Sequence, residues 1–211
     1  MIGAILTDEN AIVRTTTIYK KPMQKFDNIH NDLINIIKEK IKEELSINVD
    51  FNNAMIEIYD ENYRTMSYHT DQALDLVDDS YICIFSIYSN PLGNLRKLFI
   101  KNKKDNSTKN ILLDNNSIVF FSTDTNKQFL HKISLEKSTT DNMWLGITLR
   151  LSKTFIKKIN EKIYINDKIL TMATDEEKIA FRCFKRLENE TCDFIYPEIT
   201  YTTNPMDLII S

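Results

Sequence analysis

The chain has 211 residues, 42% hydrophobic and 27% charged, so it is long enough to bury a core without disulfides. Its 3 glycines and 4 prolines exclude collagen-like and proline-rich classes, and no stretch approaches the roughly 18 apolar residues of a membrane span. The net charge of −3 gives no overall basic field, and 3 cysteines without a secretory start favour a reducing interior. We therefore expect an intracellular monomer, in the cytoplasm or the nucleus, with no membrane partner.

Two segments predict helices. Residues 28–45 carry apolar side chains three or four apart, from Ile29 to Leu45, while lysines and glutamates fill the other face. A second helix is expected to begin after Thr174, because Thr174 and Glu177 have the spacing of a capping box.

Between these helices, short runs rich in β-forming residues alternate with turn-forming clusters. The runs lie at 54–59, 65–71, 81–88, 95–101, 110–113, 117–122, 128–133 and 144–151. Their number and length predict a mainly β fold with flanking helices (α+β), either a jelly roll or a barrel. We expect residues 1–155 to form this domain, and 156–211 to form a helical and extended annex packed on it.

Three histidines occur in the chain, and two of them form a pattern that suits a metal ion. On a strand, His69 and Asp71 point to the same face, and His131 falls on a later predicted strand. Two imidazoles and one carboxylate leave open positions on Fe(II), the arrangement of non-haem iron oxygenases. The alternative is a strand imidazole hydrogen-bonded to a nearby carboxylate. His30, beside the first helix, is not expected to be a ligand.

The surroundings of this pattern resemble the AlkB family of iron- and 2-oxoglutarate-dependent dioxygenases. The sequence FNNAMIEIY at 51–59 precedes HTD at 69–71 by the family's distance. Residues 125–131 are similar to the family's approach to its distal histidine, and LGITLR at 145–150 is similar to its closing strand. The resemblance covers residues 14–155.

This resemblance implies a double-stranded β-helix (jelly-roll) core and oxidation of a substrate C–H bond. It implies that Fe(II) is bound by His69, Asp71 and His131, and that 2-oxoglutarate is the co-substrate. Tyr59 matches a tyrosine that helps to hold the co-substrate. Arg150 matches the last arginine of the closing strand, whose guanidinium suits a carboxylate.

Several positions depart from the family pattern. Glu57 replaces an asparagine, Trp144 replaces the arginine that binds the far carboxylate of 2-oxoglutarate, and Gly146 replaces a second asparagine. In an alternative register, Arg150 begins the family's arginine-started strand and becomes the anchor of that far carboxylate. Arg150 is the expected co-substrate residue in both registers.

The sequence says less about the substrate. Ala73 stands where nucleic-acid-repairing relatives carry an acidic residue, and a basic run from Arg96 to Lys109 is either a phosphate-binding surface or a solvated hairpin. The candidate substrate-side residues are Tyr63, Arg64, Tyr68, Lys101, Lys103 and Lys104. N-demethylation of a nucleic-acid base is the expected reaction. The alternatives are the same chemistry on a protein side chain or a small molecule, and a non-catalytic jelly-roll binding domain.

Overall fold

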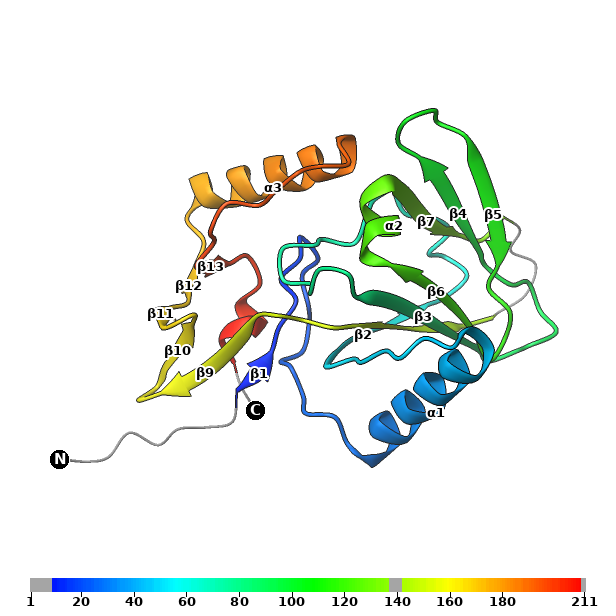
Figure 1. Cartoon of the computed structure of the whole chain (residues 1–211), viewed down its shortest axis with the longest axis horizontal. Coiled ribbons are helices and arrows are strands. Elements are labelled where there is room, and N and C mark those ends of the chain that lie inside the picture. Colours follow the sequence, from blue (N-terminus) through cyan, green and yellow to red (C-terminus); the bar gives the residue numbers. More distant parts are fainter. Residues whose placement is uncertain (1–8, 137–141, 210–211) are drawn as a thin grey trace.

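A computed structural model describes residues 9–136 and 142–209. Its larger sheet is antiparallel and has the strand order β2-β8-β3-β6 (Figure 1). The strands are β2 (Asn53–Tyr59), β8 (Trp144–Arg150), β3 (Tyr81–Tyr88) and β6 (Ser117–Ser122). These bounds match the runs predicted at 54–59, 81–88, 117–122 and 144–151 to within one residue.

A smaller sheet faces the first and has the order β5-β4-β7. It contains β4 (Lys97–Asn102), β5 (Thr108–Leu112) and β7 (Phe129–Ser134). Residues 65–71, predicted as a strand, are not one: their backbone pairs with β7 through isolated bridges, from Thr65 to Ser134 and from His69 to His131, and forms no continuous ladder. The two facing antiparallel sheets form the expected jelly roll.

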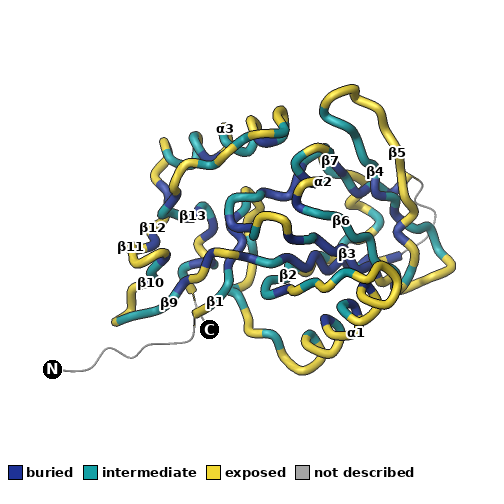
Figure 2. The backbone as a smooth tube through the Cα atoms, in the orientation of Figure 1, coloured by how far each residue is buried: buried dark blue, intermediate teal, exposed yellow. Residues whose placement is uncertain are grey.

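The core lies between the two sheets because their strands alternate inward and outward side chains. Ile84, Tyr88 and Trp144 of the larger sheet pack against Leu98 and Ile133 of the smaller one. In Figure 2 the central strands of the larger sheet are accordingly the most deeply buried part of the chain.

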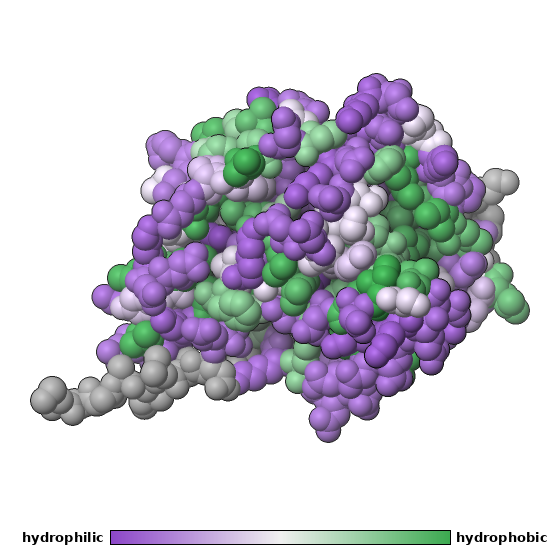
Figure 3. Space-filling model, viewed as in Figure 1, coloured by the Kyte–Doolittle hydropathy of each residue, from purple (hydrophilic) through white to green (hydrophobic). Residues whose placement is uncertain are grey.

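Helix α1 (Asn28–Leu45) has the predicted bounds and covers the outer face of the larger sheet. Its buried residues Ile34, Ile37 and Ile41 pack against outward side chains of the central strands, including Phe85 and Leu149. Its polar face gives the hydrophilic area at the lower right of Figure 3. His30 belongs to the helix cap, where its backbone N–H donates to the N-cap residue Asp27.

The annex contains more strand than the predicted helix and extended tail. Strand β1 (Asn10–Ala11) pairs with β9 (Phe155–Ile159), which continues into β10 (Lys162–Ile165) and β11 (Lys168–Ile169). The β9–β10 turn places Asn160 and Glu161 at φ 47° and 62°, and Asn166 and Asp167 repeat these values in the next turn. Two consecutive left-handed residues give the type I′ turn that matches the twist of a hairpin.

The rest of the annex contains helix α3 (Asp175–Glu190), flanked by the parallel strands β12 (Thr171–Met172) and β13 (Tyr201–Thr202). The capping box of Thr174 and Glu177 is present as predicted. A short 3-10 helix, η1 (Pro205–Leu208), follows. Among the described helices, none is long and apolar enough to span a membrane.

Candidate metal centre

His69, Asp71 and His131 converge at one end of the jelly roll. Each offers one ligand atom, and these atoms all lie within 4.8 Å of one another. His131 Nε2 lies 3.7 Å from Asp71 Oδ1, and the two imidazole rings are 4.6 Å apart. Asp71 and His131 are buried, whereas His69 is half-buried. The sequence-predicted triad is therefore brought together in a geometry that could hold a metal ion.

The two histidines are positioned by their own backbones. His69 N–H donates to the His131 carbonyl at 2.9 Å, and His131 N–H donates back to the His69 carbonyl at 2.7 Å. His69 Nδ1 donates to the Ser67 carbonyl at 3.0 Å. This bond orients the ring and leaves Nε2 for a metal, as in many histidine sites.

Asp71 lies outside any strand, so a side chain replaces the missing ladder. Asn126, on the short helix α2 (Thr123–Gln128), accepts from Asp71 N–H at 2.9 Å and donates to the Asp71 carbonyl at 2.8 Å. Asn126 is buried and was not singled out by the sequence analysis. No motif marks it, because its role arises from a tertiary contact.

Arg150 completes the environment of the Asp71 carboxylate. Its Nε donates to Asp71 Oδ2 at 2.8 Å, and both side chains are buried. Burial alone would raise the pKa of Asp71, but the Arg150 guanidinium, followed by the two imidazoles, holds that pKa well below its usual range. Arg150 is the last residue of β8, where it pairs with Asn53 and Ile82. The first of the two alignments considered above also places Arg150 at the end of a strand, whereas the alternative alignment would have it begin one.

Electrostatics also keep His131 available as a ligand. Burial, and then the neighbouring His69, lower the pKa of His131 to about 3. Its imidazole is therefore neutral near neutral pH and keeps a lone pair for a metal.

The other end of β8, at Trp144, differs from what the AlkB resemblance predicts for a site that binds the far carboxylate of 2-oxoglutarate. Trp144 is 1% exposed, and its indole lies over Gly146, where an added Cβ would come within 2.0 Å of the ring. Gly146 pairs with Glu57 of β2, whose carboxylate accepts from Tyr59 Oη at 2.5 Å. An indole and a carboxylate thus stand at the two positions where the AlkB resemblance predicted an arginine and an asparagine.

The predicted substrate-side residues are scattered. Tyr63 stacks on Tyr59 with ring centroids 4.1 Å apart, and the Arg64 carbonyl accepts from Leu135 N–H. Tyr68 lies beside the outward face of β7, with Lys132 Nζ 4.8 Å from its ring centre, whereas His131 of the triad is on the inward face of the same strand.

The predicted basic run is not one continuous surface. Arg96 is 1% exposed and donates to the carbonyls of Asp60 and Tyr63, so it belongs to the core. Lys103 Nζ donates to two carbonyls at the end of α3, those of Glu188 and Thr191. Lys101 lies 6.0 Å from the Tyr68 ring centre, and Lys104 is exposed on the hairpin turn.

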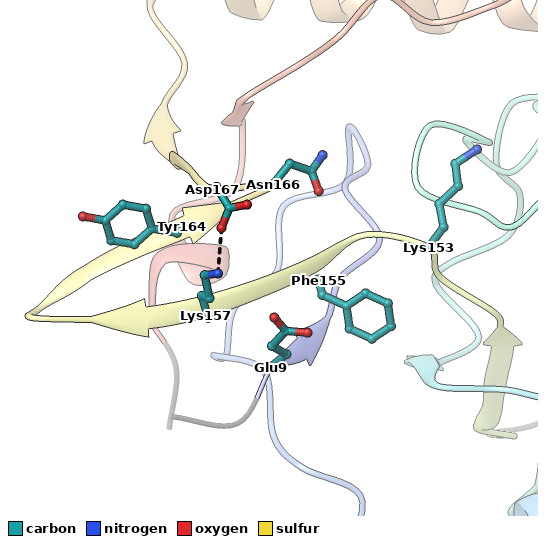
Figure 4. A pocket seen from close by; sticks show the side chains of 7 residues that line it. All are labelled: Glu9, Lys153, Phe155, Lys157, Tyr164, Asn166 and Asp167. Atoms are coloured by element: carbon teal, nitrogen blue, oxygen red, sulfur yellow. Dashed lines mark hydrogen bonds and ion pairs between the residues drawn. The ribbon is translucent and has the colours of Figure 1, made fainter. Parts of the chain in front are cut away.

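Two surface hollows lie away from the triad. One, of about 240 Å³, is drawn in Figure 4 and is crossed by the ion pair of Lys157 with Asp167. Its lining residues are Glu9, Lys153, Phe155, Lys157, Tyr164, Asn166 and Asp167. The other, of about 410 Å³, lies between β1, β2 and residues 23–26. Neither is lined by a triad residue.

A jelly roll that presents two imidazoles and a carboxylate at one end defines the class of non-haem metal oxygenases. Residues 7–155 match the family model of the 2OG-Fe(II) oxygenase superfamily, and the chain belongs to that family. A search among curated proteins finds no match. The expected jelly-roll fold and Fe(II)/2-oxoglutarate-dependent dioxygenase chemistry are thereby confirmed at the level of the superfamily. The annex from 156 onwards lies outside the match.

The residues present fit the two groups that the family uses, Fe(II) and 2-oxoglutarate, at the triad end. Two imidazole nitrogens and one carboxylate oxygen form a donor set that suits Fe(II). Arg150 Nη1 is buried without a hydrogen-bond partner among the described residues, so it can donate to a bound carboxylate. When bound, the two groups supply oxidation of a C–H bond, coupled to oxidative decarboxylation of 2-oxoglutarate.

Proposed function

We propose that this chain is an AlkB-type dioxygenase that removes an N-methyl group from a nucleic-acid base. The observation that carries this proposal is the bond from Arg150 to Asp71. It joins the last residue of the AlkB-like segment 145–150 directly to the triad.

In this proposal each residue has a defined task. His69, Asp71 and His131 hold the metal. Arg150 keeps the Asp71 carboxylate ionised and offers Nη1 to the near carboxylate of the co-substrate. Tyr59 lies on the inward face of β2 and offers its hydroxyl once Glu57 releases it.

A small basic and aromatic surface supports nucleic acid as the substrate class. Lys101 and Lys132 lie on the outward face of the smaller sheet and approach the ring of Tyr68. Tyr68 directly precedes the triad residue His69 in the segment that bridges to β7, so this surface adjoins the metal-ligand segment from the outer side of the smaller sheet. Lysines supply phosphate contacts and a tyrosine ring can stack on a base.

A second candidate is the same chemistry on a protein side chain or a small molecule. Ala73 N–H donates to the Glu188 carboxylate at 2.8 Å, so Ala73 serves an internal contact and presents no acid of its own to a base. The net charge of −3 also gives little general attraction for nucleic acid.

Product analysis separates these candidates. The Fe(II)-loaded protein is incubated with 2-oxoglutarate and O2, and with methylated DNA, methylated RNA, methylated peptides or no substrate, and succinate and formaldehyde are measured. Formaldehyde formed only with a nucleic acid supports the proposal, and formaldehyde formed only with peptides supports the second candidate. Asp71→Ala is the inactive control. If the metal-loaded protein releases no succinate under any condition, the enzyme assignment fails.

A further inference from the structure

Helix α3 belongs to the annex outside the family match, but its last turn reaches the metal-ligand segment. In Figure 1 the helix lies apart from the two sheets, and its C-terminal end points toward α2 and the β4–β5 hairpin. The contacts are made by Lys185, Glu188 and Asn189 with residues 70–73.

These contacts bind the backbone on both sides of Asp71. Asn189 Oδ1 accepts from Thr70 N–H at 3.0 Å and from the Thr70 hydroxyl at 3.1 Å. Glu188 Oε1 accepts from Ala73 N–H at 2.8 Å. Lys185 Nζ donates to the Thr70 carbonyl.

The Glu188 carboxylate is itself held firmly. The residue Glu188 is 6% exposed, and the second oxygen of its carboxylate accepts from Lys185 Nζ at 3.1 Å and from Tyr196 Oη at 2.8 Å. A buried carboxylate with donors on both oxygens is a costly arrangement to break, because removing a partner leaves a polar group unpaired. The Glu188 side chain at the end of α3 is therefore held in one position, from which it binds Ala73 N–H.

We propose that α3 is a positioning element of the metal centre, in which Asn189 and Glu188 determine where the Asp71 carboxylate lies. Residues 70–73 form no strand, so side chains fix their backbone in place of a ladder. Asn126 holds Asp71 itself, and α3 holds the residues on either side. This inference rests on the metal binding contained in the proposed function.

The test is metal affinity, measured with Co(II) as an air-stable probe of the same site. Outer contacts that orient metal ligands are typically worth about 10–100-fold in metal affinity. Asn189→Ala should weaken Co(II) binding by about that factor and change the visible ligand-field bands. Asn189→Asp keeps an acceptor for Thr70 N–H and should restore most of the affinity.

The matched control is on the same helix. Arg186 and Glu190 form an ion pair whose side chains are 70% and 60% exposed, and neither contacts residues 70–73 in the described structure. Arg186→Ala should leave the Co(II) affinity and spectrum unchanged. Glu188→Gln, which keeps an acceptor for Ala73 N–H but weakens the pair with Lys185, gives a second, milder variant with an expected several-fold loss.

The outcomes separate this inference from the proposed function. A wild-type protein that binds no Co(II) would refute the metal centre itself. A wild-type protein that binds Co(II), together with Asn189→Ala and Glu188→Gln variants of unchanged affinity and spectrum, would overturn the role of α3 alone. An equal loss in Arg186→Ala would also overturn it, because the effect would then be one of general helix stability.

Discussion

The Asp71 carboxylate is surrounded by the Arg150 guanidinium and the imidazoles of His69 and His131, so it links the metal site to the expected co-substrate residue. Replacing Arg150 with alanine removes the donor to Asp71 Oδ2 and the buried unpaired Nη1. We expect Arg150→Ala to weaken 2-oxoglutarate binding by about 2–4 kcal/mol, the scale for losing one partner of a desolvated charge pair. Anaerobic titration of the Fe(II) protein, followed by the visible metal-to-ligand band, measures this loss. An unchanged affinity would place the carboxylate contact on another residue.

Glu57 should act in the opposite direction. Its carboxylate accepts the Tyr59 hydroxyl and would repel the far carboxylate of 2-oxoglutarate at this end of β8. We expect Glu57→Gln to tighten 2-oxoglutarate binding several-fold in the same titration. Binding of 2-oxobutyrate, which has no far carboxylate, should not change. If Glu57→Gln weakens 2-oxoglutarate binding, the carboxylate is part of the co-substrate site and not an obstacle to it.

Single residues also show where sequence reasoning succeeds and where it stops. The triad could be predicted because His69 and Asp71 are local and His131 follows in a recognisable segment. Arg96 was grouped with the basic run, although it precedes the inward residues Leu98 and Ile100 by two and four positions and therefore lies on the same, core-facing side. Period-two spacing carried that signal. Asn126 had no such signal, since its contact with Asp71 spans 55 positions.

At the scale of elements, patterning predicted regular strands well and the irregular ligand segment poorly. The strands β3 and β6 have the predicted bounds because both carry long β-branched and aromatic runs. Residues 65–71 (TMSYHTD) carry only two threonines and one tyrosine as β-forming residues, and side chains of α2 and α3 bind the end of this segment in place of a neighbouring strand. In the annex, β9 and β10 were missed because their turns use Asn-Glu and Asn-Asp, which signal a hairpin less strongly than Asn-Gly.

The 3-10 helix η1 gives a prediction about pH. Burial raises the pKa of Asp207 to about 6, although its Oδ2 accepts from the Thr202 hydroxyl. The folded state therefore binds a proton more tightly than the unfolded state, so the stability falls as the pH rises from about 4 to about 6. Asp207→Asn should raise the unfolding free energy at pH 8 by on the order of 2 kcal/mol and flatten its pH dependence. Urea unfolding at pH 4.5 and pH 8 measures both effects, and a variant less stable than wild type at pH 8 would contradict the expectation.

At the scale of the whole molecule, one buried arginine joins the parts that the chain separates. Arg14 donates to both carboxylate oxygens of Asp75, four residues after Asp71, and to the carbonyls of Ile199 and Tyr201 in the annex. The N-terminal segment, the ligand segment and the annex therefore share one polar contact. Asp75 is committed to this pair and is not free to replace the acidic residue that is absent at Ala73.

Nucleic-acid binding is tested by its dependence on salt. Each lysine that meets a phosphate contributes about one unit to the slope of log affinity against log salt. Lys101 and Lys132 share the face beside Tyr68. Replacing both with glutamine should therefore make the slope shallower by about two units. Lys103 is left in place because it binds the end of α3, and Lys162→Gln on β10 is the matched control. Fluorescence anisotropy with a methylated single-stranded oligonucleotide at several salt concentrations gives the slopes.

Equal slopes in the double variant and the control would remove this surface from the nucleic-acid proposal. Binding by wild type that does not respond to salt would move the proposal toward a protein or small-molecule substrate.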